Sequence, residues 1–186
     1  MLKARKLGRA AFTLLEVMVV TTIMSSQANN YGEVKRIAYQ KSCANNLRQI
    51  YQGLLMYDMT NGGLPDAKFY PKDPKTDPKS LVKLLGPSFE PVCVCPVFPS
   101  AIKETGLTYI FNDELAGQSL DQVRDARKTW LVTEMNAVSD KVPMPHPGGF
   151  HILYADGHID VTQDRPAIFA EMQKELEEKA KSGEGS

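Results

Sequence analysis

The apolar positions near the amino end of the chain follow two helical patterns. Residues 10–24 (AAFTLLEVMVVTTIM) form an apolar run that contains one carboxylate, Glu16. From Glu33 to about Met59, apolar residues recur every three or four positions, at Val34, Ile37, Leu47, Ile50, Leu54 and Tyr57. This spacing predicts a long amphipathic helix with one buried stripe, ended by Asn61-Gly62-Gly63.

Polar and proline-rich segments interrupt these patterns. Residues 25–32 (SSQANNYG) predict a weakened or broken helix between the two patterns. Three prolines in residues 69–80 (FYPKDPKTDPKS) predict a surface loop. We expect Ser80 to cap a short helix, LVKLL, that ends at Gly86.

Further along the chain the apolar period becomes that of strands, at residues 107–112, 128–135 and 150–162. Asp156-Gly157 inside the last segment predicts a hairpin with a two-residue turn, in which both central residues have positive φ. We therefore expect a small antiparallel sheet packed on the helix that starts at Glu33, which is an α+β fold.

A final amphipathic helix is predicted after Asp164, with Pro166 in its first turn. Its apolar stripe consists of Phe169, Met172 and Leu176. The polar end, residues 181–186 (KSGEGS), is expected to be disordered.

The overall charge is balanced, with 22 Lys+Arg against 22 Asp+Glu, so no nucleic-acid partner is expected. Lys3, Arg5, Lys6 and Arg9 nevertheless precede the apolar run without any acid among them. Basic residues before an apolar run are typical of an export or membrane-insertion signal. As a helix the run would be about 22 Å long, which is short for a hydrocarbon core of about 30 Å.

This basic leader followed by FTLLEVMVV resembles the prepilin signal shared by type IV pilins and type II secretion pseudopilins. The resemblance implies that a prepilin peptidase cuts between Ala11 and Phe12 and methylates the new amine of Phe12. It also implies that Glu16 pairs with the Phe12 amine of a neighbouring subunit during assembly. A carboxylate inside a bilayer costs about 2.5 to 3.5 kcal/mol, so it needs such a partner.

A second resemblance lies in the C-terminal half. His146, nine intervening residues and Asp156-Gly157 are similar to the signature of a large bacterial group of prepilin-like proteins. The strings SCANNLRQIYQGLLMY, Cys95-Pro96 and TWLVTE follow the order of that group, so the resemblance covers roughly Phe12 to Val161. It implies a pilin-like fold with a leader peptide (1–11), an N-terminal helix (12–61), an α+β head (62–164) and a C-terminal helix with a disordered tail (165–186).

The function that this resemblance implies is structural. The precursor would sit in the inner membrane through its single N-terminal helix, with the head in the periplasm, and then enter a periplasmic or cell-surface filament of a type II secretion system or type IV pilus. Its partners would be prepilin peptidase and other pilin or pseudopilin subunits, in a homo- or heteropolymer. We expect no enzymatic activity, because the chain lacks GxSxG, HExxH and phosphate-binding glycine motifs.

An ordinary secretory signal peptide is the alternative interpretation of the amino end. Ser26-Gln27-Ala28 forms a small-x-small cleavage site before Asn29. The mature chain would then be a secreted, soluble ligand- or metal-binding module.

The three cysteines, Cys43, Cys93 and Cys95, are too few for a disulfide scaffold and lack CxxC spacing. In an exported chain one bridge is expected, with Cys43–Cys95 the candidate and Cys93 its competitor. Three reduced thiols remain the alternative.

Histidines and carboxylates near the hairpin invite a calcium or zinc interpretation, with His146, Asp156 and His158 as the candidate ligands. Turn geometry explains Asp156-Gly157 without a metal, and we expect no cofactor. Glu134 is expected to form a hydrogen bond or salt bridge at the sheet edge rather than to act as a general base.

Overall fold

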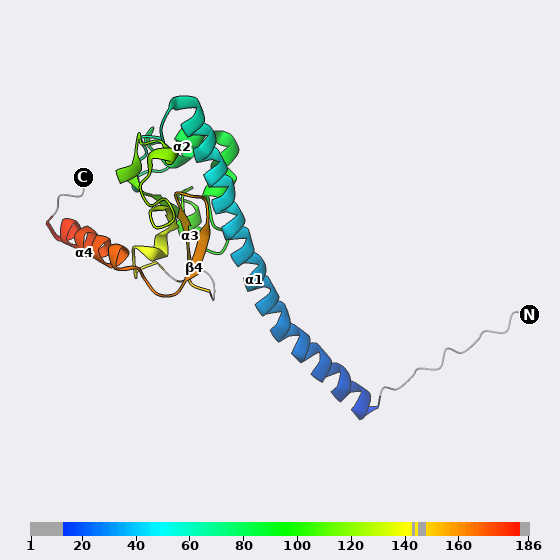
Figure 1. Ribbon diagram of the computed structural model, residues 1–186. Helices are drawn as coiled ribbons and strands as arrows, with labels where there is room; N and C mark the ends of the chain where they lie inside the picture. Colours follow the sequence, from blue (N-terminus) through cyan, green and yellow to red (C-terminus); the bar gives the residue numbers. More distant parts are fainter. Residues whose placement is uncertain (1–12, 143, 145–147, 183–186) are drawn as a thin grey trace, which may run out of the picture. The chain divides into compact units, whose positions relative to one another are not determined.

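The computed structural model describes residues 13–142, 144 and 148–182 (Figure 1). Contacts within the chain divide it into two compact units, one up to Arg36 and the other from Ile37 onward, and we call the second unit the head. The chain is α+β, as expected. Its helices are α1 (Leu14–Asn61), α2 (Leu81–Leu85), α3 (Ser100–Lys103) and α4 (Ala167–Ser182), with short 3-10 helices η1 (Pro87–Cys93), η2 (Asp113–Leu115), η3 (Leu120–Gln122) and η4 (Met135–Ala137).

Helix α1 covers both apolar patterns without the break expected at residues 25–32. The helix does not break there because the polar residues lower helix propensity by at most about 0.7 kcal/mol each, and Gly32 by about 1 kcal/mol. No proline lies between Leu14 and Asn61 to remove a backbone donor. The predicted end is confirmed: Gly62 has φ +75°, and its N–H donates to the carbonyl of Asp58 at 2.7 Å.

The predicted strands form one antiparallel sheet in the order β1-β2-β3-β4. Its strands are β1 (Tyr109–Phe111), β2 (Trp130–Glu134), β3 (Phe150–Tyr154) and β4 (Ile159–Thr162). The register pairs Ile110 with Thr133 and Ile152 with Asp160. The inner strands β2 and β3 are buried along almost their whole length, so both faces of the sheet must be covered.

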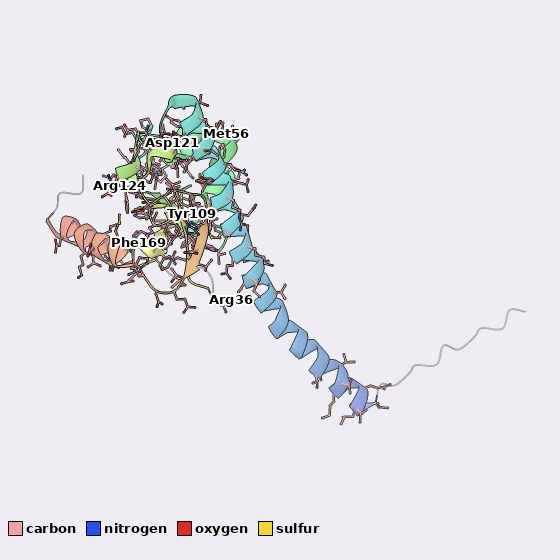
Figure 2. The ribbon with its side chains drawn as sticks, in the orientation of Figure 1. Arg36, Met56, Tyr109, Asp121, Arg124 and Phe169 are labelled. Carbon is pink, nitrogen blue, oxygen red and sulfur yellow. A yellow bond between two sulfur atoms is a disulfide. The ribbon has the colours of Figure 1, made fainter. Side chains whose placement is uncertain are left out.

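One face of the sheet packs on the C-terminal half of α1, as predicted. Cys43, Leu47, Ile50 and Leu54 of this helix share a buried core with strand residues that include Tyr109, Phe111, Val132 and Leu153. Tyr109 lies among the densely packed side chains of the head, whereas Met56 on α1 is exposed (Figure 2). This packing fixes the position of α1 residues 43–54 against the sheet.

The opposite face of the sheet packs on α4. Phe169 of this helix lies 5.2 Å from Trp130 and 6.4 Å from Phe150, measured between ring centroids. Phe169 and Met172 therefore form part of the buried stripe, as expected, whereas the side chain of Leu176 lies outside the described part of the chain. The helix extends to Ser182, into the segment predicted to be disordered, and residues 183–186 are not described.

The β3–β4 hairpin differs from the prediction in its turn. The N–H of Tyr154 donates to the carbonyl of His158 at 2.9 Å, which leaves a three-residue loop, 155–157, rather than a two-residue turn. Gly157 has φ +88°, but among the described residues Asp125 is the one non-glycine residue with positive φ. Asp156 therefore keeps negative φ, and its carboxylate accepts a hydrogen bond from the N–H of His158 at 3.1 Å.

Residues 69–80 contain neither helix nor strand, as predicted. Ser80 occupies the N-cap position of α2, but the expected side-chain cap is absent. Its carbonyl instead accepts hydrogen bonds from the N–H groups of Lys83 and Leu84, both at 3.0 Å. The hydroxyl of Ser80 is buried and has no hydrogen-bond partner among the described residues.

Candidate functional site

The first residues of α1 carry the predicted assembly motif. Ala11 and Phe12 lie outside the described residues. The carboxylate of Glu16 accepts hydrogen bonds from the N–H and hydroxyl of Thr13, at 2.8 and 2.9 Å, and the Thr13 hydroxyl accepts from the N–H of Glu16 at 3.3 Å. This reciprocal arrangement is a capping box, so Glu16 closes the amino end of the helix. The T-x-x-E spacing is visible in the sequence, but we did not predict this role from it.

The turns after this cap expose apolar side chains on all sides of the helix. The exposed fraction is 78% for Leu14, 72% for Leu15 and 62% for Met18, and Val17, Val19 and Val20 are about half exposed. Because successive residues are 100° apart around a helix, these positions leave no polar face. No helix among the described residues is both long enough and apolar enough to cross a membrane.

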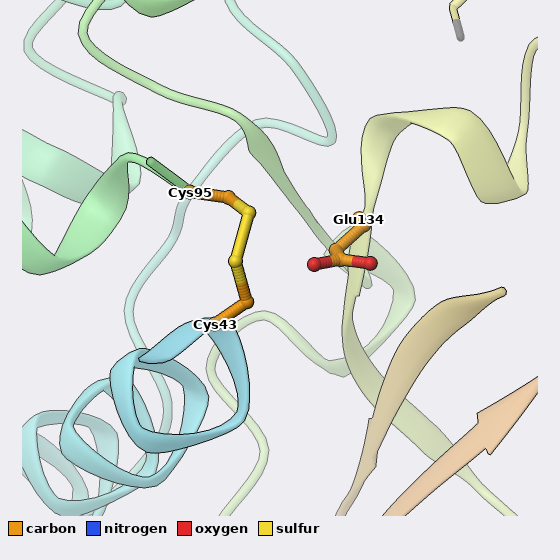
Figure 3. A group of neighbouring side chains, drawn as sticks. All are labelled: Cys43, Cys95 and Glu134. Carbon is orange, nitrogen blue, oxygen red and sulfur yellow. A yellow bond between two sulfur atoms is a disulfide. The ribbon is translucent and has the colours of Figure 1, made fainter. Parts of the chain in front are cut away.

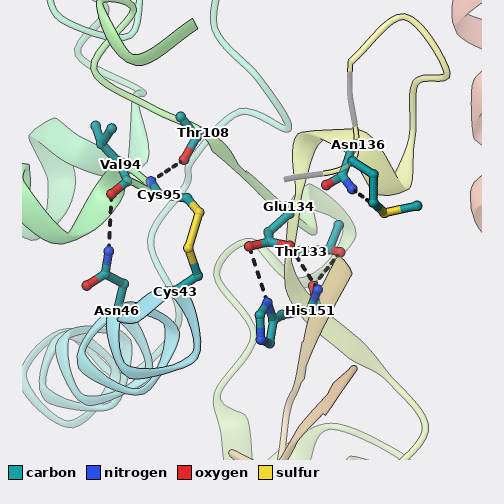
Figure 4. Close-up of polar contacts among 10 residues, drawn as sticks. Cys43, Asn46, Val94, Cys95, Thr108, Thr133, Glu134, Asn136 and His151 are labelled. Atoms are coloured by element: carbon teal, nitrogen blue, oxygen red, sulfur yellow. Dashed lines mark hydrogen bonds and ion pairs between the residues drawn. A yellow bond between two sulfur atoms is a disulfide. The ribbon is translucent and has the colours of Figure 1, made fainter. Parts of the chain in front are cut away.

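Within the head, a disulfide bond fastens the C-terminal half of α1 to the segment after η1. It joins Cys43 on α1 to Cys95, which follows η1, with 5.3 Å between their α-carbons. The amide of Asn46 donates to the carbonyl of Val94 at 3.1 Å, and the N–H of Cys95 donates to the hydroxyl of Thr108 at 2.7 Å (Figure 4). The structure thus brings together the candidate pair from the sequence and leaves Cys93 as a buried free thiol.

A buried carboxylate lies beside this disulfide. The sulfurs of Cys43 and Cys95 and a carboxylate oxygen of Glu134 all lie within 4.8 Å of one another (Figure 3). Glu134 comes from β2, and its side chain has no exposed surface. Because β2 is an inner strand, the expected position of Glu134 at the sheet edge is wrong, whereas its expected role in hydrogen bonding is confirmed.

His151 of the neighbouring strand β3 holds this carboxylate. Its backbone N–H donates to Oε2 of Glu134 at 3.0 Å, and its ring Nδ1 lies 3.3 Å from Oε1 (Figure 4). These contacts compensate the carboxylate for the water that it loses on burial. Burial and the charge of Glu134 together raise the pKa of the nearby Tyr109 hydroxyl well above its ordinary value.

The hairpin places two of the proposed metal ligands in direct contact with each other. Nδ1 of His158 hydrogen-bonds to a carboxylate oxygen of Asp156, and the His158 ring stacks on Tyr154 with 4.3 Å between centroids. Burial opposes ionisation of Asp156, but hydrogen bonds from His158 outweigh it and lower the pKa of the carboxyl. The third candidate, His146, lies outside the described residues. The hairpin carboxylate is thus already occupied by protein donors.

Within the described part of the chain, the one group of three or more metal-ligating side chains that lie close together is Cys43, Cys95 and Glu134. Sequence reasoning considered each residue separately and did not connect them, because they come from three different elements. The signal that could have linked Glu134 to His151 is the antiparallel pairing of β2 with β3. Thr133 pairs with Ile152, so the next residue on β2, Glu134, lies opposite the preceding residue on β3, His151.

The geometry supports two kinds of chemistry at different places. The start of α1 offers an exposed apolar surface with one charged group, which suits packing against lipid or other chains. The buried group offers soft sulfur and hard oxygen atoms at short range, although the sulfurs are bonded to each other. No protein-family model, curated protein or solved structure matches the chain.

Proposed function

We propose that this chain is a pilin-like or pseudopilin subunit, cut between Ala11 and Phe12 and assembled through α1 into a filament of a type II secretion system or type IV pilus. One observation carries the proposal: the FTLLEVMVV string follows a basic leader, and its described residues form a helix whose apolar side chains are exposed.

The apolar side chains at the start of α1 are not buried by the chain itself. Burying one Val, Leu or Met side chain is worth about 1.5 to 3 kcal/mol. Six such side chains between Leu14 and Val20 are exposed, so a lipid surface or other copies of the helix would stabilise the segment strongly. A filament in which neighbouring helices pack together supplies such a surface, whether the filament lies in the periplasm or on the cell surface.

The location follows from the same proposal. The basic leader keeps the amino end on the cytoplasmic side of the inner membrane, and the head enters the periplasm. The Cys43–Cys95 disulfide suits an oxidising compartment of this kind. Because the apolar run is short, we propose that lipid holds it only in the precursor and that neighbouring subunits bury it after assembly.

The alternative is a secreted module cut after Ala28. It is favoured by the head, which forms a compact unit with its own core and disulfide. This cut would remove the exposed apolar side chains between Leu14 and Val20, and the remaining chain would act through the head.

The mature amino terminus separates these two functions. We would express the chain in cells that contain both prepilin peptidase and signal peptidase, and determine the terminus by mass spectrometry. The proposal expects N-methylated Phe12, whereas the alternative expects Asn29.

Two matched variants make this test reciprocal. Ala11→Leu should block the first cut and spare the second, because it enlarges the residue before Phe12. Ala28→Leu should do the reverse, because it destroys the small-x-small site. A terminus at Asn29 that disappears in Ala28→Leu would overturn the proposed filament role.

A further inference from the structure

We propose that Cys43, Cys95 and Glu134 form a binding site for a zinc-like divalent cation when the disulfide is reduced, and that the disulfide excludes the cation. The inference concerns the head and does not depend on the proposed filament role. The proposed site does not include the hairpin residues Asp156 and His158.

The ligand set and its geometry support this site. Two thiolates and one carboxylate are a ligand set that zinc accepts, with a fourth position left for water. The three ligand atoms already lie within 4.8 Å of one another. Tetrahedral coordination with Zn–S bonds of about 2.3 Å requires the two sulfurs to be about 3.8 Å apart. Reduction breaks the bond between the sulfurs, so they can move to this spacing while Cys43, Cys95 and Glu134 stay next to one another.

His151 prepares the third ligand before any cation arrives. It holds both oxygens of the Glu134 carboxylate, one through its backbone N–H at 3.0 Å and the other through its ring at 3.3 Å. Residues that orient a ligand in this way contribute about 10- to 100-fold to metal affinity. His151 is therefore a positioning residue for this site and not a ligand.

The surroundings favour a soft cation over a hard one. Cys43, Cys95 and Glu134 have no exposed surface, and their neighbours are mostly apolar core residues. Calcium and magnesium need several oxygen ligands, whereas this group supplies one carboxylate and two sulfurs. Thiolate ligands select zinc and similar ions.

The redox step determines when the site exists. A dithiol reductant gives two electrons and two protons to the Cys43–Cys95 bond, so two thiols form and the reductant becomes a disulfide. The divalent cation then displaces the two thiol protons and forms two metal–sulfur bonds and one metal–carboxylate bond. In the reverse direction a small-molecule disulfide takes two electrons from the two thiolates and two protons from solvent and becomes a dithiol, so the Cys43–Cys95 bond re-forms and the cation leaves. A reducing compartment would therefore favour the metal form and an oxidising compartment the disulfide form.

Cobalt(II) is the probe that tests this inference, because thiolate coordination gives it a strong near-ultraviolet charge-transfer band. The purified chain is reduced with a water-soluble phosphine, which takes up an oxygen from water and becomes a phosphine oxide. We expect the reduced chain to bind one equivalent of cobalt with this band, and zinc to displace it. The oxidised chain should show no band.

Four variants identify the ligands. Cys43→Ser should abolish the band, Glu134→Gln should weaken cobalt binding more than about 10-fold, and His151→Phe should weaken it about 10- to 100-fold. Cys93→Ala should leave binding unchanged, since Cys93 is outside the group. Binding that survives Glu134→Gln unchanged, or that is lost in Cys93→Ala, would overturn the assignment.

The fold of the reduced chain is followed in parallel by circular dichroism. If reduction unfolds the head, cobalt should restore its helical signal, because metal binding is coupled to folding at such sites. A reduced chain that neither binds stoichiometric cobalt nor refolds with it would refute the site.

Discussion

The ring of Tyr51 on α1 lies against the α-carbon of Gly157 in the β3–β4 loop. A β-carbon added at Gly157 would come within 2.7 Å of Cε1 of Tyr51. Gly157 also has φ +88°, a backbone conformation that residues other than glycine rarely adopt. The glycine of the Asp156-Gly157 pair thus serves both the turn and the close approach of the hairpin to the helix.

Gly157→Ala should lower the free energy of unfolding by about 2 to 5 kcal/mol. The positive φ costs about 1 to 2 kcal/mol, and displacement of the Tyr51 ring adds an overpacking cost of about 1 to 3 kcal/mol. Urea unfolding measures the loss. Gly62→Ala is the matched control, because Gly62 has φ +75° but nothing within 4 Å of an added β-carbon. An equal loss in both variants would contradict the role of Tyr51.

The Cys43–Cys95 bond should contribute about 4 kcal/mol to stability, because it closes a loop with a sequence separation of 52. The double variant Cys43→Ala/Cys95→Ala should lose this amount in urea unfolding. Adding a reductant to the native chain should produce a similar loss and should leave the double variant unaffected. A native chain as stable with reductant as without it would contradict the estimate.

The free thiol of Cys93 should be inert in the folded chain. Burial, with a smaller contribution from Glu90, raises its pKa from the ordinary 9.0 to about 12. The thiolate is the reactive form, so alkylation below pH 9 should be about a thousandfold slower in the folded chain than in urea. Mass spectrometry after iodoacetamide treatment measures the two rates. Fast labelling of the native chain would show that the thiol is accessible as thiolate.

The same raised pKa gives the stability a pH dependence. Below pH 9 the thiol keeps its proton in both states, so it has no effect there. Between about pH 9 and 12 the unfolded chain loses this proton and the folded chain keeps it, so stability falls as pH rises, by about 2 kcal/mol at pH 10.5. Cys93→Ala should remove this part of the decrease. The raised pKa of Tyr109 acts in the same direction and remains in the variant.

Asp58 joins the end of α1 to the segment around η3. Its carboxylate accepts hydrogen bonds from the N–H of Leu120 at 3.0 Å and from the hydroxyl of Ser119 at 3.1 Å, and the residue is buried. Asp58→Ala should cost about 2 kcal/mol, because it leaves a buried donor without an acceptor. Asp58→Asn keeps one acceptor oxygen and should cost about half as much. Equal losses in urea unfolding would show that charge, rather than hydrogen bonding, is what matters there.

Periodicity, together with turn and cap signals, located the strands and the main helices of the head. The strand patterns at residues 107–112, 128–135 and 150–162 correspond to β1, β2 and the β3–β4 hairpin. Local rules failed where weak preferences compete. The loss of helix propensity at residues 25–32 was too small to break a helix that continues on both sides of this segment. The loop at Asp156 contains one more residue than the two that the Asp-Gly pair predicts.

The candidate sites were predictable to different degrees. Glu16 could be selected from a sequence string, because the resemblance assigns its role. Cys43–Cys95 could be named as a candidate bridge, but Cys93 remained a competitor until the structure showed the pairing. The contact of Glu134 with His151 and the two sulfurs could not, because it depends on how α1 docks on the sheet. Long-range packing of this kind has no local signal in a single sequence.

The two roles of Glu16, helix cap and ion-pair partner, can be separated by variants that keep one and remove the other. Glutamine at this position still accepts a hydrogen bond from the N–H of Thr13, so Glu16→Gln keeps the cap and removes the charge. Thr13→Ala does the opposite, because it removes the hydroxyl partner and keeps the carboxylate.

If Glu16 pairs with the Phe12 amine of a neighbouring subunit, Glu16→Gln and Glu16→Ala should both fail to enter filaments while their heads stay folded. Thr13→Ala should assemble, with its helix frayed at the first turn and a cap loss of about 1 kcal/mol. Fractionation of sheared filaments measures incorporation, and retention of the Cys43–Cys95 bond reports the fold of the head. Normal assembly of Glu16→Gln together with failure of Thr13→Ala would assign Glu16 to capping alone, because the neutral amide would then suffice wherever the cap is kept.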